Sequence, residues 1–173
     1  EYGWNGLLIE PNPANHATLH ARKAALVVKA AWKRSGERLV FHATKASGLS
    51  TLAGVTPGDL HDRSQFEAIE VETMTLDDIL AEAGAPRVID YLSIDVEGAE
   101  TDVLDGLSLD RWDVRAMSLE HNNDKQRAAE FDRRLGSHGL VRVLEIVSDF
   151  DAYYTRPECM EAWRRGNAMA NVA

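Results

Sequence analysis

An apolar run from Val88 to Ile94 ends at a cluster of carboxylates, and this feature restricts the fold more than any other. Because the run lacks a regular polar alternation, it predicts a strand buried on both faces, as in parallel sheets. In open α/β sheets, ligands bind beyond the carboxyl ends of such strands. Asp95, Glu97 and Glu100 therefore stand where a protein of this class binds its ligand.

Length and composition limit the class of protein. The chain has 173 residues, enough to bury roughly two thirds of its unfolded surface in one core, and we expect a single domain over residues 1–173. The net charge of −9 and the absence of a long Lys/Arg run argue against a nucleic-acid partner. The single cysteine, Cys159, excludes an internal disulfide and fits a reducing compartment.

The sequence contains no membrane or export signal. No apolar stretch approaches the roughly 20 residues of a membrane span, and no signal-peptide pattern opens the chain. We therefore expect a cytoplasmic protein. Because the chain begins with Glu1 rather than Met, we expect an N-terminally truncated segment.

Strand and helix patterns alternate along the chain, which predicts a doubly wound, mostly parallel α/β sheet. A turn at Ser35-Gly36 predicts that the second and third strands form a hairpin-like pair. The helix after Thr75 shows the clearest periodicity, with a capping signature and apolar residues at i, i+3, i+4 and i+7. The predicted strands are 7–10, 26–30, 38–42, 66–73, 88–94, 114–120 and 140–147, and the predicted helices are 14–25, 75–83, 98–104 and 124–135.

The segment 44–64 contains three glycines and a proline and has little periodicity, so it predicts a long loop. Loops of this length are uncommon unless they cover a site. We expect this segment to be a mobile cover.

Three predicted strands end in polar residues: Glu10, the Asp95–Glu97 pair, and the run 120–123, Glu-His-Asn-Asn. The carboxyl ends of parallel strands lie at one edge of a sheet, so these groups are expected to converge. An acid that ends an early strand, such as Glu10, typically accepts hydrogen bonds from ribose hydroxyls. The alternative is an acid that stabilises the start of the next helix.

Asp95 and Glu97 are two residues apart, so an extended backbone places them on one face. Such a pair can bind a metal or accept a proton. For Glu97 and Glu100 a structural alternative exists, because acids in the first turn of a helix are favoured by the dipole. His121 follows the strand-end acid Glu120 and is a candidate general base, with a structural histidine as the alternative.

Six segments, in this order and at similar spacing, resemble the FkbM-type methyltransferases. The resemblance runs from residue 3 to about residue 122. It implies an S-adenosylmethionine-dependent O-methyltransferase with the Rossmann-like class I fold. The six segments are Gly3–Gly6, Ile9–Pro13, Val28–Trp32, Ser47–Ser50, Thr75–Leu80 and Ile94–Glu100.

The resemblance also implies roles for individual residues. Glu10 would hold the cofactor ribose, with Asn12 beside it, and Asp95 would lie near the methionine part and the methyl group. The adenine would be bordered by Ala30, Ala31 and Trp32. The family's first strand and glycine-rich loop would precede Glu1 and are absent from this segment.

Methyl transfer requires alignment of the acceptor hydroxyl and removal of its proton. The expected catalytic residues are Asp95, Glu97, Glu120 and His121. A divalent metal ion held by Asp95, Glu120 and Asn122 could instead lower the pKa of the hydroxyl.

The acceptor is expected to be a small molecule, a sugar or a glycan, and the sequence does not distinguish among them. Two other functions remain open: a non-catalytic binding or assembly module, and a nicotinamide-dependent oxidoreductase. The dinucleotide fingerprint of the latter is not found, although its usual position would precede Glu1.

Overall fold

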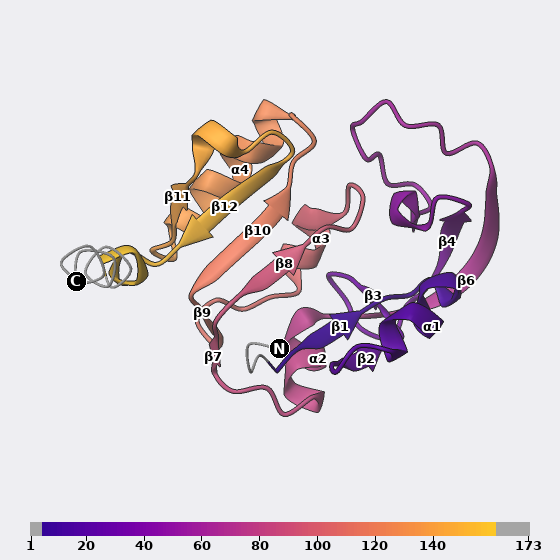
Figure 1. Cartoon of the computed structure of the whole chain (residues 1–173), viewed down its shortest axis with the longest axis horizontal. Coiled ribbons are helices and arrows are strands. Elements are labelled where there is room, and N and C mark those ends of the chain that lie inside the picture. The colour runs from indigo at the N-terminus through magenta and orange to yellow at the C-terminus, as the bar shows by residue number, and fades with distance from the viewer. Residues whose placement is uncertain (1–4, 162–173) are drawn as a thin grey trace, which may run out of the picture. The chain divides into compact units, whose positions relative to one another are not determined.

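The computed structural model describes residues 5–161, and the chain divides into two compact units (Figure 1). The first unit comprises the chain up to Ala85 together with Val96–Ser108, and the second comprises Pro86–Asp95 and the chain from Leu109 onward. Gly3 and Trp4 of the resembling segments lie outside the described residues. The single domain expected over 1–173 remains a prediction.

The first unit contains short strands and helices in alternation. Its elements are β1 (Leu7–Ile9), α1 (Pro13–His20), β2 (Ala25–Val27), β3 (Ala30–Ala31), β4 (Arg38–Thr44), the 3₁₀ helix η1 (Ser47–Leu49), β5 (Thr51–Leu52), β6 (Phe66–Met74), α2 (Leu76–Glu82) and α3 (Glu100–Asp105).

The strands of the first unit form two sheets. β1 pairs with β2 in parallel. The other sheet has the order β3-β6-β4-β5, in which β6 runs parallel to β3 and antiparallel to β4. The predicted hairpin-like pair is therefore wrong, because β4 pairs with β6 along its whole length, from Arg38 opposite Glu72 to Thr44 opposite Phe66. Both segments are long enough to satisfy each other's backbone groups, whereas β2 already pairs with β1.

Alternation along β4 and β6 gives this sheet one buried face. Phe41 on β4 and Val71 on β6 form a core cluster with Ala30 and Leu52. Val40, on the opposite face of β4, is exposed.

The most regular predicted helix is confirmed as α2. The Thr75 hydroxyl accepts the backbone N–H of Asp78 at 3.1 Å and caps the helix. Leu76, Ile79 and Leu80 are buried. Ala83 is exposed instead of inward-facing, because the helix ends at Glu82 and Ala83 is its C-cap.

The second unit is built around one four-stranded sheet with the order β11-β12-β10-β8. β8 is parallel to β10, and β12 is antiparallel to both of its neighbours. A separate parallel pair joins β7 to β9. The elements are β7 (Val88–Ile89), β8 (Leu92–Ile94), β9 (Asp113–Val114), β10 (Ala116–Glu120), α4 (Lys125–Gly136), β11 (Val141–Val143), the 3₁₀ helix η2 (Glu145–Val147) and β12 (Asp151–Thr155), and residues 157–161 are helical.

Four predicted strands are interrupted or shortened. The run 26–30 breaks after Val27, and its last residue, Ala30, begins β3 in the other sheet of the first unit. The run 88–94 breaks at Asp90-Tyr91 into β7 and β8, and Ser93 is exposed, so the prediction of burial on both faces is wrong. The run 114–120 breaks at Arg115 into β9 and β10. The run 140–147 is a strand only as far as Val143, because the backbone at Leu144 is left-handed, with φ 58°. β12 was not predicted.

Helix α4 is confirmed, with Asp124 as its N-cap. The Asp124 carboxylate accepts the backbone N–H groups of Gln126 at 2.8 Å and Arg127 at 3.2 Å. The predicted inward residues Ala128, Phe131 and Leu135 are buried, and the helix lies against β11 (Figure 1).

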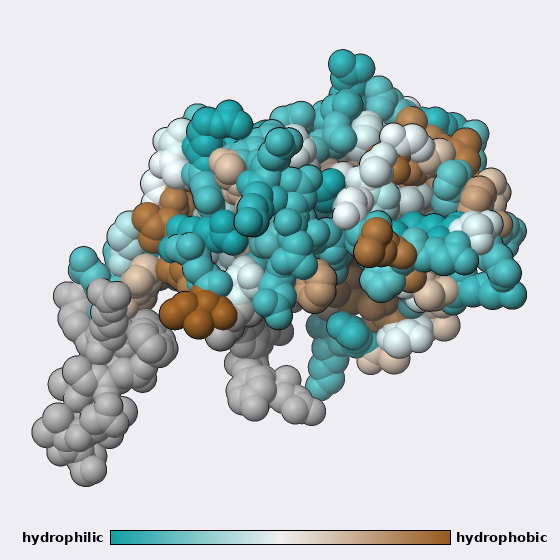
Figure 2. All heavy atoms as spheres, turned by 90° about the horizontal axis from the view of Figure 1, so that it is seen from above, coloured by the Kyte–Doolittle hydropathy of each residue, from teal (hydrophilic) through white to brown (hydrophobic). Residues whose placement is uncertain are grey.

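The fold class is therefore confirmed as mixed α/β, with small sheets that combine parallel and antiparallel pairs. A doubly wound, mostly parallel sheet is not confirmed. Among the described residues, no helix is long and apolar enough to cross a membrane. Hydrophilic residues cover most of the face shown in Figure 2, as the acidic composition predicts.

We predict that Gly106→Ala destabilises the first unit. A Cβ on Gly106 would lie 2.5 Å from the carbonyl oxygen of Trp32, so the backbone must shift, at a cost of about 1–3 kcal/mol. Gly136→Ala is the matched control, because a Cβ there meets nothing within 4 Å. Urea unfolding of both variants measures the difference, and equal stabilities would contradict the prediction.

Candidate functional site

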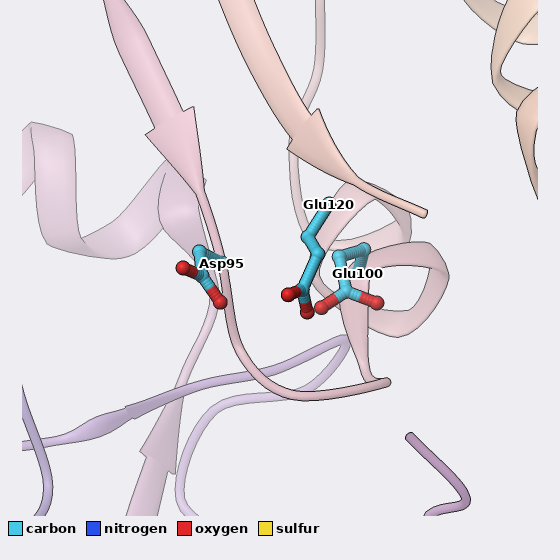
Figure 3. Close-up of side chains that lie close together, drawn as sticks. All are labelled: Asp95, Glu100 and Glu120. Carbon is cyan, nitrogen blue, oxygen red and sulfur yellow. The ribbon is translucent and has the colours of Figure 1, made fainter. Parts of the chain in front are cut away.

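In the second unit, the sheet register aligns three acids at one end of neighbouring strands. Asp95 follows Ile94 of β8, which pairs with Leu119, so Asp95 lies next to Glu120 of β10. Glu120 in turn pairs with Asp151 of β12. Carboxylate oxygens of Asp95 and Glu120 lie within 4.8 Å of one another (Figure 3). The structure thus brings together two predicted site residues and adds Asp151.

The environment of Asp95 raises the pKa of its carboxyl. Although the residue is exposed, desolvation by the surrounding atoms is the largest cause, and the negative charge of Asp151 is the second. A carboxylate with a raised pKa is a better proton acceptor at neutral pH. Sequence reasoning missed Asp151 because β12 was not predicted.

A row of hydroxyl groups lies next to these acids on the same sheet. The Tyr91 hydroxyl and the Ser118 hydroxyl are hydrogen-bonded at 2.7 Å, and Ser118 donates to Ser93 at 2.9 Å. Ser118 pairs with Tyr153, whose hydroxyl has a raised pKa mainly because of the charge of Asp151. The face of the sheet that carries the cross-strand partners Ser93, Ser118 and Tyr153 is therefore polar from β8 to β12.

His121 is buried, with 5% of its surface exposed. Its Nδ1 accepts the backbone N–H of Asn123 at 3.1 Å, which places the proton on Nε2. Nε2 has no hydrogen-bond partner among the described residues. Desolvation, followed by the charge of Arg142, lowers the pKa of His121. This geometry favours the structural alternative, and the role of general base remains a prediction.

In the first unit, Glu10 follows β1 and anchors the start of α1. One carboxylate oxygen accepts the backbone N–H of Asn12 at 2.7 Å, and the other accepts the side-chain amide of Asn15 at 2.8 Å. These contacts are what the helix-start alternative predicts. Because each carboxylate oxygen can accept a second hydrogen bond, Glu10 keeps acceptor capacity for a ligand.

Asn12 is almost fully buried, with 1% of its surface exposed. Its side-chain oxygen accepts the N–H of Ala14 at 3.0 Å, and its amide donates to the Ser50 hydroxyl at 3.1 Å. The same hydroxyl accepts the N–H of Thr44 at 3.1 Å. Asn12 therefore joins α1 to the loop before β5, and its predicted role in cofactor binding remains untested.

Of the three residues expected to border an adenine, Ala30 is buried and Ala31 and Trp32 are half-buried. The indole N–H of Trp32 donates to Glu37 at 3.1 Å, and the ammonium of Lys33 lies 4.9 Å from the ring centroid. These contacts hold the indole in one orientation.

The turn after β8 contains two left-handed residues, Glu97 with φ 55° and Gly98 with φ 105°. A left-handed conformation costs a residue with a side chain about 1–2 kcal/mol. The fully buried carboxylate of Glu100, on the first turn of α3 (Figure 3), accepts the N–H groups of Val96 at 3.1 Å and Gly98 at 3.0 Å. Glu100 thus has the structural role that the sequence left open.

The buried Glu97 is part of an ion cluster with the half-buried Arg63 and Asp59, which the sequence did not reveal. The Nη2 group of Arg63 donates a hydrogen bond to the Glu97 carboxylate. Both Nη groups also donate to the Asp59 carboxylate, with 2.6 Å between Nη2 and Oδ2. The Arg63 hydrogen bond is the largest cause that lowers the pKa of Asp59 to about 2, and the pKa of Arg63 is raised. Arg63 lies 34 residues before Glu97, so no local pattern links the two.

The first unit also contains a pocket of about 530 Å³ between the start of α1 and the adjoining ends of β4 and β6. Asn12, Thr44 and Phe66 are among its lining residues. Phe66 stacks on His42 with ring centroids 3.9 Å apart. The pocket lies in the first unit beside the segment that Glu10 anchors, within the size range of small-molecule sites.

The family model of the methyltransferase FkbM domain matches residues 1–150 of the chain. No curated protein and no solved structure matches the chain significantly.

We predict that His121 makes stability pH-dependent. Because its pKa is lowered in the folded state, its contribution is present above the unfolded pKa of about 6.5 and is lost as pH falls below it. His121→Asn keeps an acceptor for the N–H of Asn123 but does not titrate. Urea unfolding at pH 7.5 and 5.5 should show a smaller pH effect in this variant.

The control is His20→Asn, at an exposed position in the last turn of α1. It should keep the pH effect of the unmodified protein. An equal pH effect in both variants would contradict the assignment to His121.

Proposed function

This chain belongs to the FkbM methyltransferase domain family, and we propose that it transfers a methyl group from S-adenosylmethionine to a hydroxyl group of a small molecule, sugar or glycan. The observation that carries the proposal is Asp95, which has a raised pKa and follows β8 beside Glu120. Such a carboxylate suits the removal of a hydroxyl proton.

We also propose that the chain is one domain with the Rossmann-like class I fold. The parallel pairs β1–β2 and β8–β10 and the helices that alternate with these strands support this arrangement. The antiparallel pairs of β4 and β12 would then be additions to a parallel sheet.

The residues present fit the cofactor. Each Glu10 carboxylate oxygen accepts one protein hydrogen bond and can accept another, as a ribose diol requires. Ala30 and Ala31 have small side chains, and the oriented indole of Trp32 offers a flat surface to an adenine. Glu10 would thus bind the ribose end, with Asn12 fixing the start of α1 beside it, and residues 30–32 would border the base.

When bound, S-adenosylmethionine supplies an activated methyl group on a sulfonium. Asp95 is proposed to accept the hydroxyl proton of the acceptor and to favour positive charge near the methyl group. Desolvation and, after it, the charge of Asp151 keep the pKa of Asp95 raised, and Glu120, which pairs with Asp151, adds a further carboxylate to this region. Glu97 and His121 would act only indirectly, because Arg63 engages Glu97 and His121 is a neutral buried imidazole.

A divalent metal ion is a second proposal for the same acids. Asp95 and Glu120 offer two oxygen ligands within 4.8 Å, whereas Mg²⁺ takes six ligands, of which several are usually water. Such an ion would lower the pKa of the acceptor hydroxyl. Loss of methyl transfer in a chelator and its recovery with added magnesium would support it.

We predict that Glu10→Gln weakens S-adenosylmethionine binding by about tenfold to a hundredfold, because a charge-assisted hydrogen bond contributes roughly 1.5–3 kcal/mol. Isothermal titration measures the affinity, and thermal unfolding measures the effect on α1. Glu70→Gln, at an exposed β6 residue that pairs with Arg38, should bind like the unmodified protein. Unchanged affinity in Glu10→Gln would overturn the ribose assignment.

We predict that Asp95→Asn lowers methyl transfer about a hundredfold without unfolding the protein. The measurement is S-adenosylhomocysteine release with a panel of sugars and hydroxylated small molecules. Asp90→Asn, at an exposed acid that pairs with Arg115, should keep full activity, and Glu97→Gln should lose less than Asp95→Asn. Full activity in Asp95→Asn would show that the reaction does not take place at this strand end.

Titration of the unmodified protein with NADH separates the remaining functions. Binding of NADH but not S-adenosylmethionine would favour an oxidoreductase. Binding of S-adenosylmethionine without turnover on any acceptor would favour a binding module.

A further inference from the structure

We propose that Arg63 is a positioning residue for cofactor binding, because it ties the loop before β6 to the turn that follows Asp95. The proposal rests on the function proposed above. It states that Arg63, which lies outside the strand ends, helps to hold the backbone next to Asp95 in place. Arg63 binds Glu97 in the middle of the turn 96–98. The backbone of this turn continues directly from Asp95.

The turn is strained and is held from several directions. Glu97 has φ 55°, a conformation that residues with side chains seldom adopt. Its carboxylate accepts from Arg63, and its carbonyl accepts the Thr51 hydroxyl at 2.8 Å. The Glu100 carboxylate accepts the backbone N–H groups on either side of Glu97. Strain that the surroundings over-determine in this way is typical of functional turns.

The loop and the turn are also in close backbone contact. A Cβ on Gly98 would lie 2.6 Å from the Cα of Pro57 and 2.8 Å from the carbonyl oxygen of Thr56. Gly98 therefore permits an approach that no other residue allows. The loop cannot move away from the turn unless these contacts and the Arg63 ion pair break together.

Arg63 is suited to this task because its guanidinium binds three groups at once. It binds Asp59 within the loop, Glu97 in the turn and, through Nε, the carbonyl oxygen of Leu49 at 2.9 Å. The side chains of Arg63, Asp59 and Glu97 are 14%, 12% and 11% exposed. Buried charges of this kind are costly if a partner is removed. The segment 44–64 is thus anchored near its end, and the expectation that it is a mobile cover stays a prediction.

The test compares the full-length protein with Arg63→Met, Arg63→Lys and Arg38→Met. Titration with S-adenosylhomocysteine measures affinity, hydrogen exchange reports on residues 96–100, and thermal unfolding reports on stability. Arg38→Met is the matched control, because Arg38 pairs with Glu70 in an exposed ion pair.

We expect Arg63→Met to weaken S-adenosylhomocysteine binding at least tenfold and to speed exchange at residues 96–100. Arg63→Lys should recover part of the affinity, because the ammonium keeps one ion pair but not the fork geometry. Arg38→Met should bind normally. If Arg63→Met does not fold, Thr51→Val must show a severalfold loss of affinity, because it removes the hydroxyl that binds the Glu97 carbonyl.

Two results would overturn the proposal and are distinguishable. If the unmodified protein binds and Arg63→Met, or Thr51→Val in its place, binds within twofold of it, Arg63 is merely structural and the proposed function stands. If the unmodified protein does not bind S-adenosylhomocysteine, the proposed function fails and the role of Arg63 fails with it.

Discussion

The partly buried ion pair between Arg63 and Glu97 is the interaction on which the first unit's loop and turn depend. It links a segment without regular structure to a left-handed turn that would otherwise be unfavourable. A lone arginine buried at this position would be costly, so its two acidic partners are required for the fold of the segment. The pair also explains why Glu97, an attractive candidate acid in the sequence, is engaged in holding the backbone.

In the second unit, the register of the strands brings the acidic residues together at one edge of the sheet. Antiparallel β12 places Asp151 opposite Glu120, and parallel β8 brings Asp95 next to Glu120. Desolvation is the largest cause of the raised pKa of Asp95, and the negative charge of Asp151 on the neighbouring part of the sheet raises it further. The chemistry proposed for Asp95 therefore depends on a strand whose sequence contains no motif that would mark it as part of a site.

Much of the local structure was predictable because it depends on short-range signals. The cap at Thr75 and the apolar spacing after it produced α2, and Asp124 with Ala128, Phe131 and Leu135 produced α4. The partner of β4 was not predictable in the same way, since β6 begins more than twenty residues after β4 ends and pairing across that distance leaves no local pattern. Sequence reasoning also overextended strands 88–94 and 140–147, because apolar composition does not show where a backbone turns.

The sequence by itself determined the α/β class, the family to which the chain belongs and the strand-end positions of Glu10, Asp95 and Glu120, because these depend on periodicity and on motifs within a few residues. Only the tertiary structure decided which of the acids are already engaged. In the structure, Glu100 accepts a backbone N–H of the turn before α3, and Glu97 pairs with Arg63. The neutral His121 accepts the backbone N–H of Asn123. The physical reason is that hydrogen-bond partners and desolvation arise from groups distant in the chain, which no local pattern specifies.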